Sequence, residues 1–146
     1  MKPDELRELN PGSLSKMDPT GPKVCVGAGT GLGECFLTPD ADGTYTCFPS
    51  EGGHVEWAPR NDLEIKLWKY LKQKFKYRNR ISVERVVSGP GLANVYEFLA
   101  KEFPGNVDKK IHKEFEGAGD MKGKVVAVNS SVKGSLCAQA MEIMMG

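Results

Sequence analysis

The stretch Gly27-Ala28-Gly29-Thr30-Gly31-Leu32-Gly33, which we call the glycine loop, is the most informative part of this chain. Its alternating glycines leave the backbone N–H groups of a short turn without neighbouring side chains, so a ligand can approach them closely. Backbone N–H groups gathered in this way form concave nests that bind anions such as phosphate. Thr30 adds one hydroxyl donor. We therefore predict that the glycine loop binds a phosphate group.

The residues on either side of the glycine loop indicate β-structure. Short β-branched or alternating runs predict strands over residues 23–26, 34–38 and 44–49, with a turn at residues 39–43. These β-hairpins span residues 23–50 and follow an irregular lead-in rich in Pro and Gly over residues 1–22.

The glycine loop does not match the dinucleotide pattern, because Leu32 stands where G-x-G-x-x-G needs its last glycine. No Lys-Ser or Lys-Thr pair follows it, so it is not a Walker loop either.

A second motif, Glu51-Gly52-Gly53-His54, is called the EGGH segment below. It places a carboxylate and an imidazole three residues apart around bare backbone. A carboxylate accepts hydrogen bonds from neighbouring hydroxyls and an imidazole can donate one, so the pair suits a polyhydroxylated, sugar-like ligand. Spacing alone also allows both side chains to be ordinary surface groups.

From residue 61 the apolar residues follow a helical period. Asn61 with Glu64 three residues later forms a capping box, which predicts a helix over residues 61–77. Further helices are predicted over residues 82–88, 92–103 and 135–145, and Gly89-Pro90-Gly91 is expected to end the first of these. Residues 105–123 are expected to form a polar surface loop. Glu84 falls in the first turn of the predicted helix 82–88, where the helix dipole alone is sufficient to explain a carboxylate.

The bulk composition excludes several classes of function. The chain has 146 residues, enough for one domain, and a formal net charge of +1, which predicts no general attraction to nucleic acid or anionic membranes. The four cysteines form no C-x-x-C pair, so we expect reduced thiols and no metal site. There is no apolar segment of a signal peptide and no run near the roughly 18 residues of a membrane span. We expect a cytoplasmic protein.

Three motifs in the same order resemble the bacterial-type glucokinases of the hexokinase superfamily. They are residues 26–33 (VGAGTGLG), 50–59 (SEGGHVEWAP) and 82–92 (SVERVVSGPGL). The intervals agree as well as the motifs, from about residue 23 to residue 103, with weaker similarity over residues 135–145. The resemblance implies an α/β, ribonuclease-H-like fold of the actin-like ATPase type. It also implies that residues 23–146 are part of the larger, C-terminal lobe of a two-lobed hexose kinase.

The resemblance also implies roles for individual residues. Glu51, His54 and Glu84 match the glucose-binding positions of the family. The glycine loop matches its ATP-phosphate-binding positions, here Gly27, Ala28, Gly29, Thr30, Gly31 and Gly33. The implied reaction is phosphorylation of D-glucose to glucose 6-phosphate by ATP with Mg²⁺, a step of glycolysis. Glucose and ATP are the expected partners, together with a homodimer of the intact enzyme and without nucleic acid or membrane.

The sequence also departs from the family pattern. The Asp-x-Gly-Gly-Thr phosphate motif and the Gly-Gly adenosine motif of the family are absent from the 146 residues. The Asn61-Asp62 pair lies at a helix cap, not in the context of the family's catalytic Asn-Asp pair. We therefore expect an internal piece of a glucokinase with no catalytic residue, little activity alone and marginal folding.

Two other classes of function remain open. One is a non-catalytic sugar-binding or regulatory relative of the hexokinases. The other is an interaction module acting through the basic residues of the segment 66–80, although its apolar groups fall largely on one stripe and favour a solvated amphipathic helix.

Overall fold

The computed structural model describes residues 7–76 and 79–146. The chain divides into two compact units. The first consists of Met1–Cys25 and Cys35–Pro49, and the second of Val26–Glu34 and Ser50–Gly146. The expected lead-in over residues 1–22 therefore lies partly outside the described residues, as does the end of the helix expected over residues 61–77.

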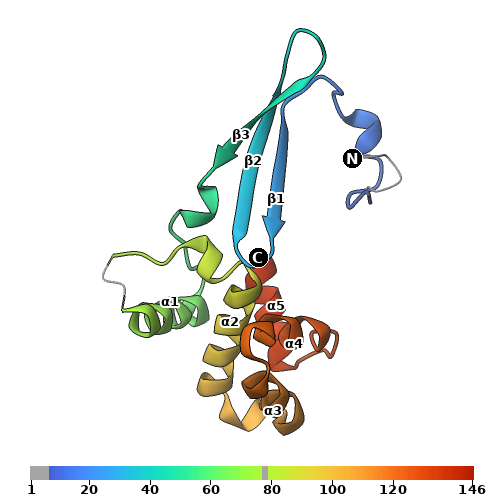
Figure 1. The fold of residues 1–146 in the computed structure, drawn as a ribbon. Coiled ribbons are helices and arrows are strands. Elements are labelled where there is room, and N and C mark those ends of the chain that lie inside the picture. The colour runs from blue at the N-terminus through green and yellow to red at the C-terminus, as the bar shows by residue number, and fades with distance from the viewer. Residues whose placement is uncertain (1–6, 77–78) are drawn as a thin grey trace. The chain divides into compact units, whose positions relative to one another are not determined.

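The three strands form one sheet in the order β1-β2-β3 (Figure 1). They are β1 (Lys23–Ala28), β2 (Leu32–Pro39) and β3 (Tyr45–Ser50). In the turn between β2 and β3, the Asp40 N–H donates to the Thr44 carbonyl at 2.9 Å. Gly43 adopts a φ of +82° there, which a residue with a side chain rarely does. A short 3-10 helix, Leu14–Lys16, precedes the sheet.

The second unit is built around α2 (Gly89–Glu102), as Figure 1 shows. The helices with most of the packing against it are α1 (Asp62–Phe75), α4 (Lys122–Val128) and α5 (Leu136–Met145). The helix α3 (Lys109–Gly117) packs on α4. The buried side chains between these helices include Leu67, Leu71, Val95, Leu99, Phe115, Val126 and Ala140. Burying such aliphatic and aromatic groups is the main stabilising contribution to this unit.

The N-cap predicted at Asn61 is present, but the returning bond of a capping box reaches the backbone N–H of Arg60 and not that of Asn61. The Asn61 side chain accepts from the Glu64 N–H at 3.0 Å. Glu64 is buried, and its carboxylate accepts from the Arg60 backbone N–H at 2.8 Å and from Arg60 Nη2 at 2.7 Å. The hydrogen bond from the Arg60 guanidinium lowers the pKa of Glu64 despite the opposing effect of burial. A charged carboxylate can therefore be buried at this position.

The structure around Gly89-Pro90-Gly91 differs from the sequence prediction. These residues begin α2 and do not end the preceding helix, and the helix expected over residues 82–88 is only the single 3-10 turn Val83–Arg85. The Ser88 hydroxyl caps α2 by accepting from the Gly91 N–H at 2.9 Å. Proline fits the first turn because its missing N–H would have no partner within the helix there.

Residues 105–123 also differ from the predicted surface loop, because they contain α3, the 3-10 turn Gly119–Met121 and the start of α4. Asp108 caps α3, and its carboxylate accepts from the N–H groups of Lys110 and Ile111. Phe115 is fully buried. Two apolar residues four positions apart, Ile111 and Phe115, are enough to attach an otherwise polar helix to the core. No helix in the described part of the chain is long and apolar enough to cross a membrane.

Candidate functional site

The glycine loop joins β1 to β2, and residues 29–31 form its tip. The Gly29 N–H donates to the Gly31 carbonyl at 2.8 Å, so this amide is used within the turn. The Gly29 carbonyl accepts from the Gly89 N–H at 2.7 Å, which attaches the loop to the first residue of α2. The N–H groups of Thr30 and Gly31 make no backbone hydrogen bond with the residues that the structure describes. Two of the three amides at the tip thus stay open to a ligand.

Unusual backbone angles do not explain the glycines of the loop, since none of them has a positive φ. A Cβ added at Gly27 or Gly29 would meet no described atom within 4 Å. A Cβ at Gly31, by contrast, would lie 2.6 Å from Glu84 Oε2. Glycine at position 31 therefore allows the Glu84 carboxylate to approach the loop, while positions 27 and 29 leave free space beside the backbone.

Backbone pairing brings the EGGH segment close to Glu84, although 30 residues separate them in sequence. Glu56 and Ser82 form an antiparallel bridge. On either side of it, the Trp57 N–H donates to the Ile81 carbonyl at 2.8 Å and the Val83 N–H donates to the Val55 carbonyl at 2.9 Å. The pairing fixes the end of the EGGH segment, the 3-10 turn Gly52–His54, beside the 3-10 turn Val83–Arg85.

The three predicted sugar-binding side chains lie together. His54 stands between two carboxylates, with Nε2 at 3.7 Å from Glu51 Oε2 and Nδ1 at 3.9 Å from Glu84 Oε1. The Glu51 side chain is 90% exposed, that of His54 51% and that of Glu84 25%. The three groups form an open, acidic cluster on the surface, with Glu84 at its inner end. This cluster offers both carboxylate oxygens of Glu51, Oε1 of Glu84 and one imidazole to a ligand.

Glu84 connects this cluster to the glycine loop. While Oε1 faces His54, Oε2 accepts a hydrogen bond from the Leu32 N–H at 2.9 Å. Gly53 completes the contact from the other side, because a Cβ there would lie only 2.2 Å from the Leu32 carbonyl oxygen. One end of the glycine loop is therefore packed directly against the EGGH segment and bonded to Glu84.

The other side of the glycine loop borders a cavity of about 780 Å³. Its lining includes Thr30, the first residues of α2, and side chains of α4 and α5 such as Ala127 and Met141. Most of these wall residues are apolar or small. Gly123 of α4 comes so close to α2 that a Cβ would lie 2.1 Å from the Gly89 carbonyl oxygen. The cavity is large enough for a drug-sized or nucleoside-sized ligand.

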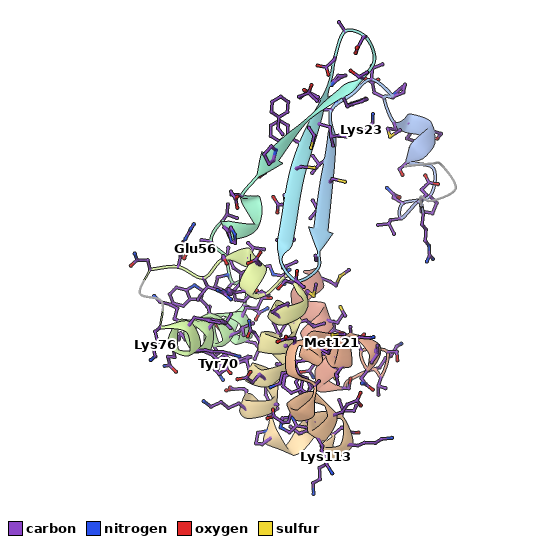
Figure 2. All side chains as sticks on the ribbon, in the orientation of Figure 1. Lys23, Glu56, Tyr70, Lys76, Lys113 and Met121 are labelled. Atoms are coloured by element: carbon purple, nitrogen blue, oxygen red, sulfur yellow. The ribbon has the colours of Figure 1, made fainter. Side chains whose placement is uncertain are left out.

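One charged network in the cavity wall was not predicted from the sequence. Glu97 of α2 accepts from Tyr70 OH at 2.6 Å and from Lys74 Nζ at 2.6 Å (Figure 2 labels Tyr70). Burial favours a raised pKa for Glu97, but the hydrogen bonds from Lys74 and Tyr70 outweigh it and lower the pKa. Burial also raises the pKa of Tyr70. The partners come from helices 20 or more residues apart, so no local sequence pattern could have revealed the network.

The family model that describes glucokinases matches residues 1–146, the whole chain. The chain belongs to the glucokinase family. It is 40% identical over 140 residues to a glucokinase of Synechocystis sp.. This match covers 89% of this chain and 39% of that protein. It is also 50% identical over 95 residues to a glucokinase of Nostoc punctiforme, a match that covers 65% of this chain and 27% of that protein.

Among solved structures, the fold is similar to a glucokinase from Balamuthia mandrillaris crystallised in complex with glucose. The TM-score is 0.70 at 24% identity, over 92% of this chain and 36% of that chain. The fold class is thus that of the glucokinases, an α/β fold of the actin-like ATPase type. The chain spans about two fifths of the length of the first of its curated relatives.

Proposed function

We propose that this chain is part of the large lobe of a glucokinase that phosphorylates glucose with ATP, and that it provides both the sugar-binding cluster and the phosphate-binding loop. The observation that carries the proposal is the convergence of Glu51, His54 and Glu84, together with the bond from Glu84 to the glycine loop. Membership of the glucokinase family supports the same reading.

On the sugar side, the carboxylates of Glu51 and Glu84 accept hydrogen bonds from neighbouring hydroxyls of glucose. His54 provides a donor or an acceptor between them. Charged acceptors form stronger hydrogen bonds than neutral ones, and an open cluster loses little solvation before the ligand arrives. Because each group contacts a different hydroxyl, the three together fix the orientation of the ring.

On the phosphate side, the free N–H groups of Thr30 and Gly31 and the Thr30 hydroxyl bind the terminal phosphates of ATP. The N-terminus of α2 begins at Gly89, directly beside Gly29, and its dipole favours a negative charge at this position. The cavity that borders Thr30 has the size and apolar lining to hold the nucleoside part of ATP.

Mg²⁺ enters this proposal only as the ion that accompanies the phosphates of ATP. Within residues 7–76 and 79–146, no group of three His, Cys, Asp or Glu side chains is arranged to hold a metal ion. The side chains of this chain therefore act on the substrates and are not assigned as metal ligands.

In the proposed reaction, the 6-hydroxyl oxygen of glucose attacks the γ-phosphate of ATP, the bond from this phosphate to the oxygen of the β-phosphate breaks, and ADP and the hydroxyl proton leave. Phosphoryl transfer depends mainly on positioning the two substrates in line and on stabilising the charge of the phosphate oxygens. The bond between Glu84 and the Leu32 N–H holds the sugar-binding cluster and the phosphate-binding loop at a fixed separation. We propose no catalytic base within this chain, because Asp62 of the Asn61-Asp62 pair lies in the first turn of α1, at the helix cap, and is not among the clustered side chains of Glu51, His54 and Glu84.

Calorimetric titration of the 146-residue chain with glucose tests the proposal. Removing one charged acceptor from Glu51 or Glu84, by Glu51→Gln or Glu84→Gln, should weaken glucose binding by about tenfold or more. Glu114 is exposed on α3, away from the cluster, so Glu114→Gln is the matched control and should bind as the unchanged chain does. Glucose binding that neither Glu51→Gln nor Glu84→Gln weakens would contradict the assignment, as would an absence of glucose binding.

A non-catalytic sugar-binding role is the second candidate, favoured by the structural role of Asn61 in the helix cap. The two are distinguished by mixing a chain extended at both ends to the length of its curated relatives with glucose and Mg-ATP and measuring glucose 6-phosphate. Turnover by the extended chain would exclude the non-catalytic role, whereas glucose binding without turnover by the extended chain would support it.

A further inference from the structure

Three of the four cysteines lie on neighbouring strands of the sheet in the first unit. Cys25 is on β1, Cys35 on the central strand β2 and Cys47 on β3. Cys25 and Cys47 are exposed and Cys35 is half-buried, whereas Cys137 of α5 is buried. This row of thiols has no part in the function proposed above. It is also not a metal site, since no metal-holding group occurs among the described residues.

The strand register places Cys25 directly opposite Cys35. The hydrogen bond from the Gly29 N–H to the Gly31 carbonyl fixes these two residues opposite each other at the tip of the hairpin. Counting four residues back along β1 and four residues forward along β2 reaches Cys25 and Cys35. The contact between Gly33 and the Gly27 carbonyl agrees with this count. Residues that face each other in this way share one side of the sheet.

Cys47 is a diagonal neighbour of Cys35. The rings of Phe36 and Phe48 stack with centroids 5.1 Å apart and planes 13° apart, which indicates that these residues are opposite each other on β2 and β3. Cys35 and Cys47 each precede one of them and so lie on the other side of the sheet, offset along the strands. The neighbouring Cys47 thiol raises the pKa of the Cys35 thiol and the neighbouring Cys25 lowers it, so Cys35 lies between the other two thiols.

Only one of the two pairs has the backbone spacing of a disulfide. Directly opposite residues in an antiparallel pair have Cα atoms about 4.5–5.5 Å apart, within the range of about 4.4–6.8 Å that disulfides need. Diagonal neighbours are about 7–8 Å apart, beyond that range. The register therefore selects Cys25 and Cys35, with Cys47 as an adjacent free thiol.

We propose that Cys25 and Cys35 form a reversible disulfide by exchange with a small-molecule disulfide such as oxidised glutathione. The exposed Cys25 thiolate attacks one glutathione sulfur, forming a mixed disulfide and releasing one glutathione thiolate. Cys35 then loses its proton to solvent, and its thiolate attacks Cys25 Sγ and releases the second glutathione. Two protein thiols are oxidised, and one glutathione disulfide is reduced to two thiols.

The bridge would enclose residues 26–34, which contain the whole glycine loop. A cross-link at the base of a hairpin restricts how far its two strands can separate, and so restricts the motion of the turn between them. The oxidation state of these thiols therefore controls the mobility of the glycine loop. If this loop binds ATP phosphates, as proposed above, oxidation also restricts the motion of the phosphate-binding site. The disulfide itself does not depend on this assignment.

Peptide mapping of the full 146-residue chain by mass spectrometry, without reduction, tests the disulfide. The chain is first equilibrated with oxidised and reduced glutathione. The expected product has lost two hydrogen atoms and contains one linked peptide pair, Cys25 with Cys35, which dithiothreitol separates. Cys47→Ser and Cys137→Ser should keep this product, and Cys25→Ser should lose it. A Cys35–Cys47 link, glutathione adducts only, or dimers only would overturn the proposal, and mapping the unchanged chain gives this answer even if a variant does not fold.

Hydrogen exchange of the loop amides tests the consequence separately. Exchange at residues 27–33 should be slower in the oxidised chain than in the reduced chain. Equal exchange rates with the disulfide present would show that the bridge forms without restricting the loop. Failure to bind glucose or nucleotide would contradict the proposed function and leave the disulfide result standing, so the two failures are distinguishable.

Discussion

Gly53→Ala should destabilise the second unit by pushing the EGGH segment away from the glycine loop. The new Cβ would lie 2.2 Å from the Leu32 carbonyl oxygen and 3.0 Å from Leu32 Cβ, whereas ordinary contacts are 3.4–4 Å. Backbone must move by about 1 Å to remove this overlap, because no flexible side chain can give way. Overpacking of this kind costs about 1–3 kcal/mol.

Gly52→Ala is a matched control for this change. The Cβ at position 52 would overlap Glu34 Oε2, the far end of a flexible side chain that can rotate away. Neither Gly52 nor Gly53 has a positive φ, so alanine fits the backbone conformation at both positions. The two variants therefore add the same methyl group to adjacent residues and differ only in whether backbone has to move.

Thermal and urea denaturation of the two variants measure the difference. For a chain of this length, a loss of 1–3 kcal/mol lowers the midpoint by about 4–12 °C. Gly52→Ala should stay within about 2 °C of the unchanged chain, since only the end of a flexible side chain has to move and the cost should be less than about 0.5 kcal/mol. Glucose binding should weaken in Gly53→Ala, because His54 follows the displaced residue. Equal stability of the two variants would refute the close packing of Gly53 on Leu32.

Three further predictions concern stability. Because the pKa of Glu64 is lowered in the folded chain, its carboxylate stabilises the fold above about pH 4.5. This contribution is lost as the pH falls through the folded-state pKa. The free energy of urea unfolding of Glu64→Gln should therefore depend less on pH, between about pH 5 and 3, than that of the unchanged chain. A parallel pH dependence in both proteins would contradict it. Leu99→Ala removes a fully buried side chain and should cost about 2–5 kcal/mol, while Leu9→Ala, at a 91% exposed position, should cost almost nothing in the same urea titration. Ser88→Ala removes the cap of α2 and should cost about 1–2 kcal/mol. Ser88→Thr keeps the hydroxyl and adds only one methyl group at this buried position, so it should retain most of the stability, and equal losses in both variants would argue against capping.

Local signals in the sequence predicted those elements whose stabilising contacts are also local. The capping box at Asn61 predicted α1, and the alternating strands around the glycine loop predicted the hairpin. The start of α2 was misplaced, because glycine and proline usually interrupt helices and only the Ser88 cap marks a beginning here. The helix α3 was missed because it is attached to the core mainly by Phe115 and Ile111 in an otherwise polar segment.

The candidate site depended on contacts that no local pattern contains. The role of Glu84 came only from the family resemblance, since its position in a helical turn explained its charge equally well. Its approach to His54 results from pairing between Glu56 and Ser82, which are 26 residues apart in sequence. The hydrogen bond between Glu84 and Leu32 likewise joins segments that are 52 residues apart. Long-range pairing of this kind follows from the fold as a whole.

The pairing of Val55 with Val83 and of Trp57 with Ile81 closes the segment between His54 and Glu84, two members of the proposed sugar-binding cluster, into a loop. The two ends of this loop are held together by backbone atoms, so the spacing between His54 and Glu84 does not depend on the exposed side chains of α1. The outward surface of α1 can therefore change its charge or acquire a label while the geometry of the cluster stays the same. This surface is a suitable place for a fluorophore that reports on binding without taking part in it.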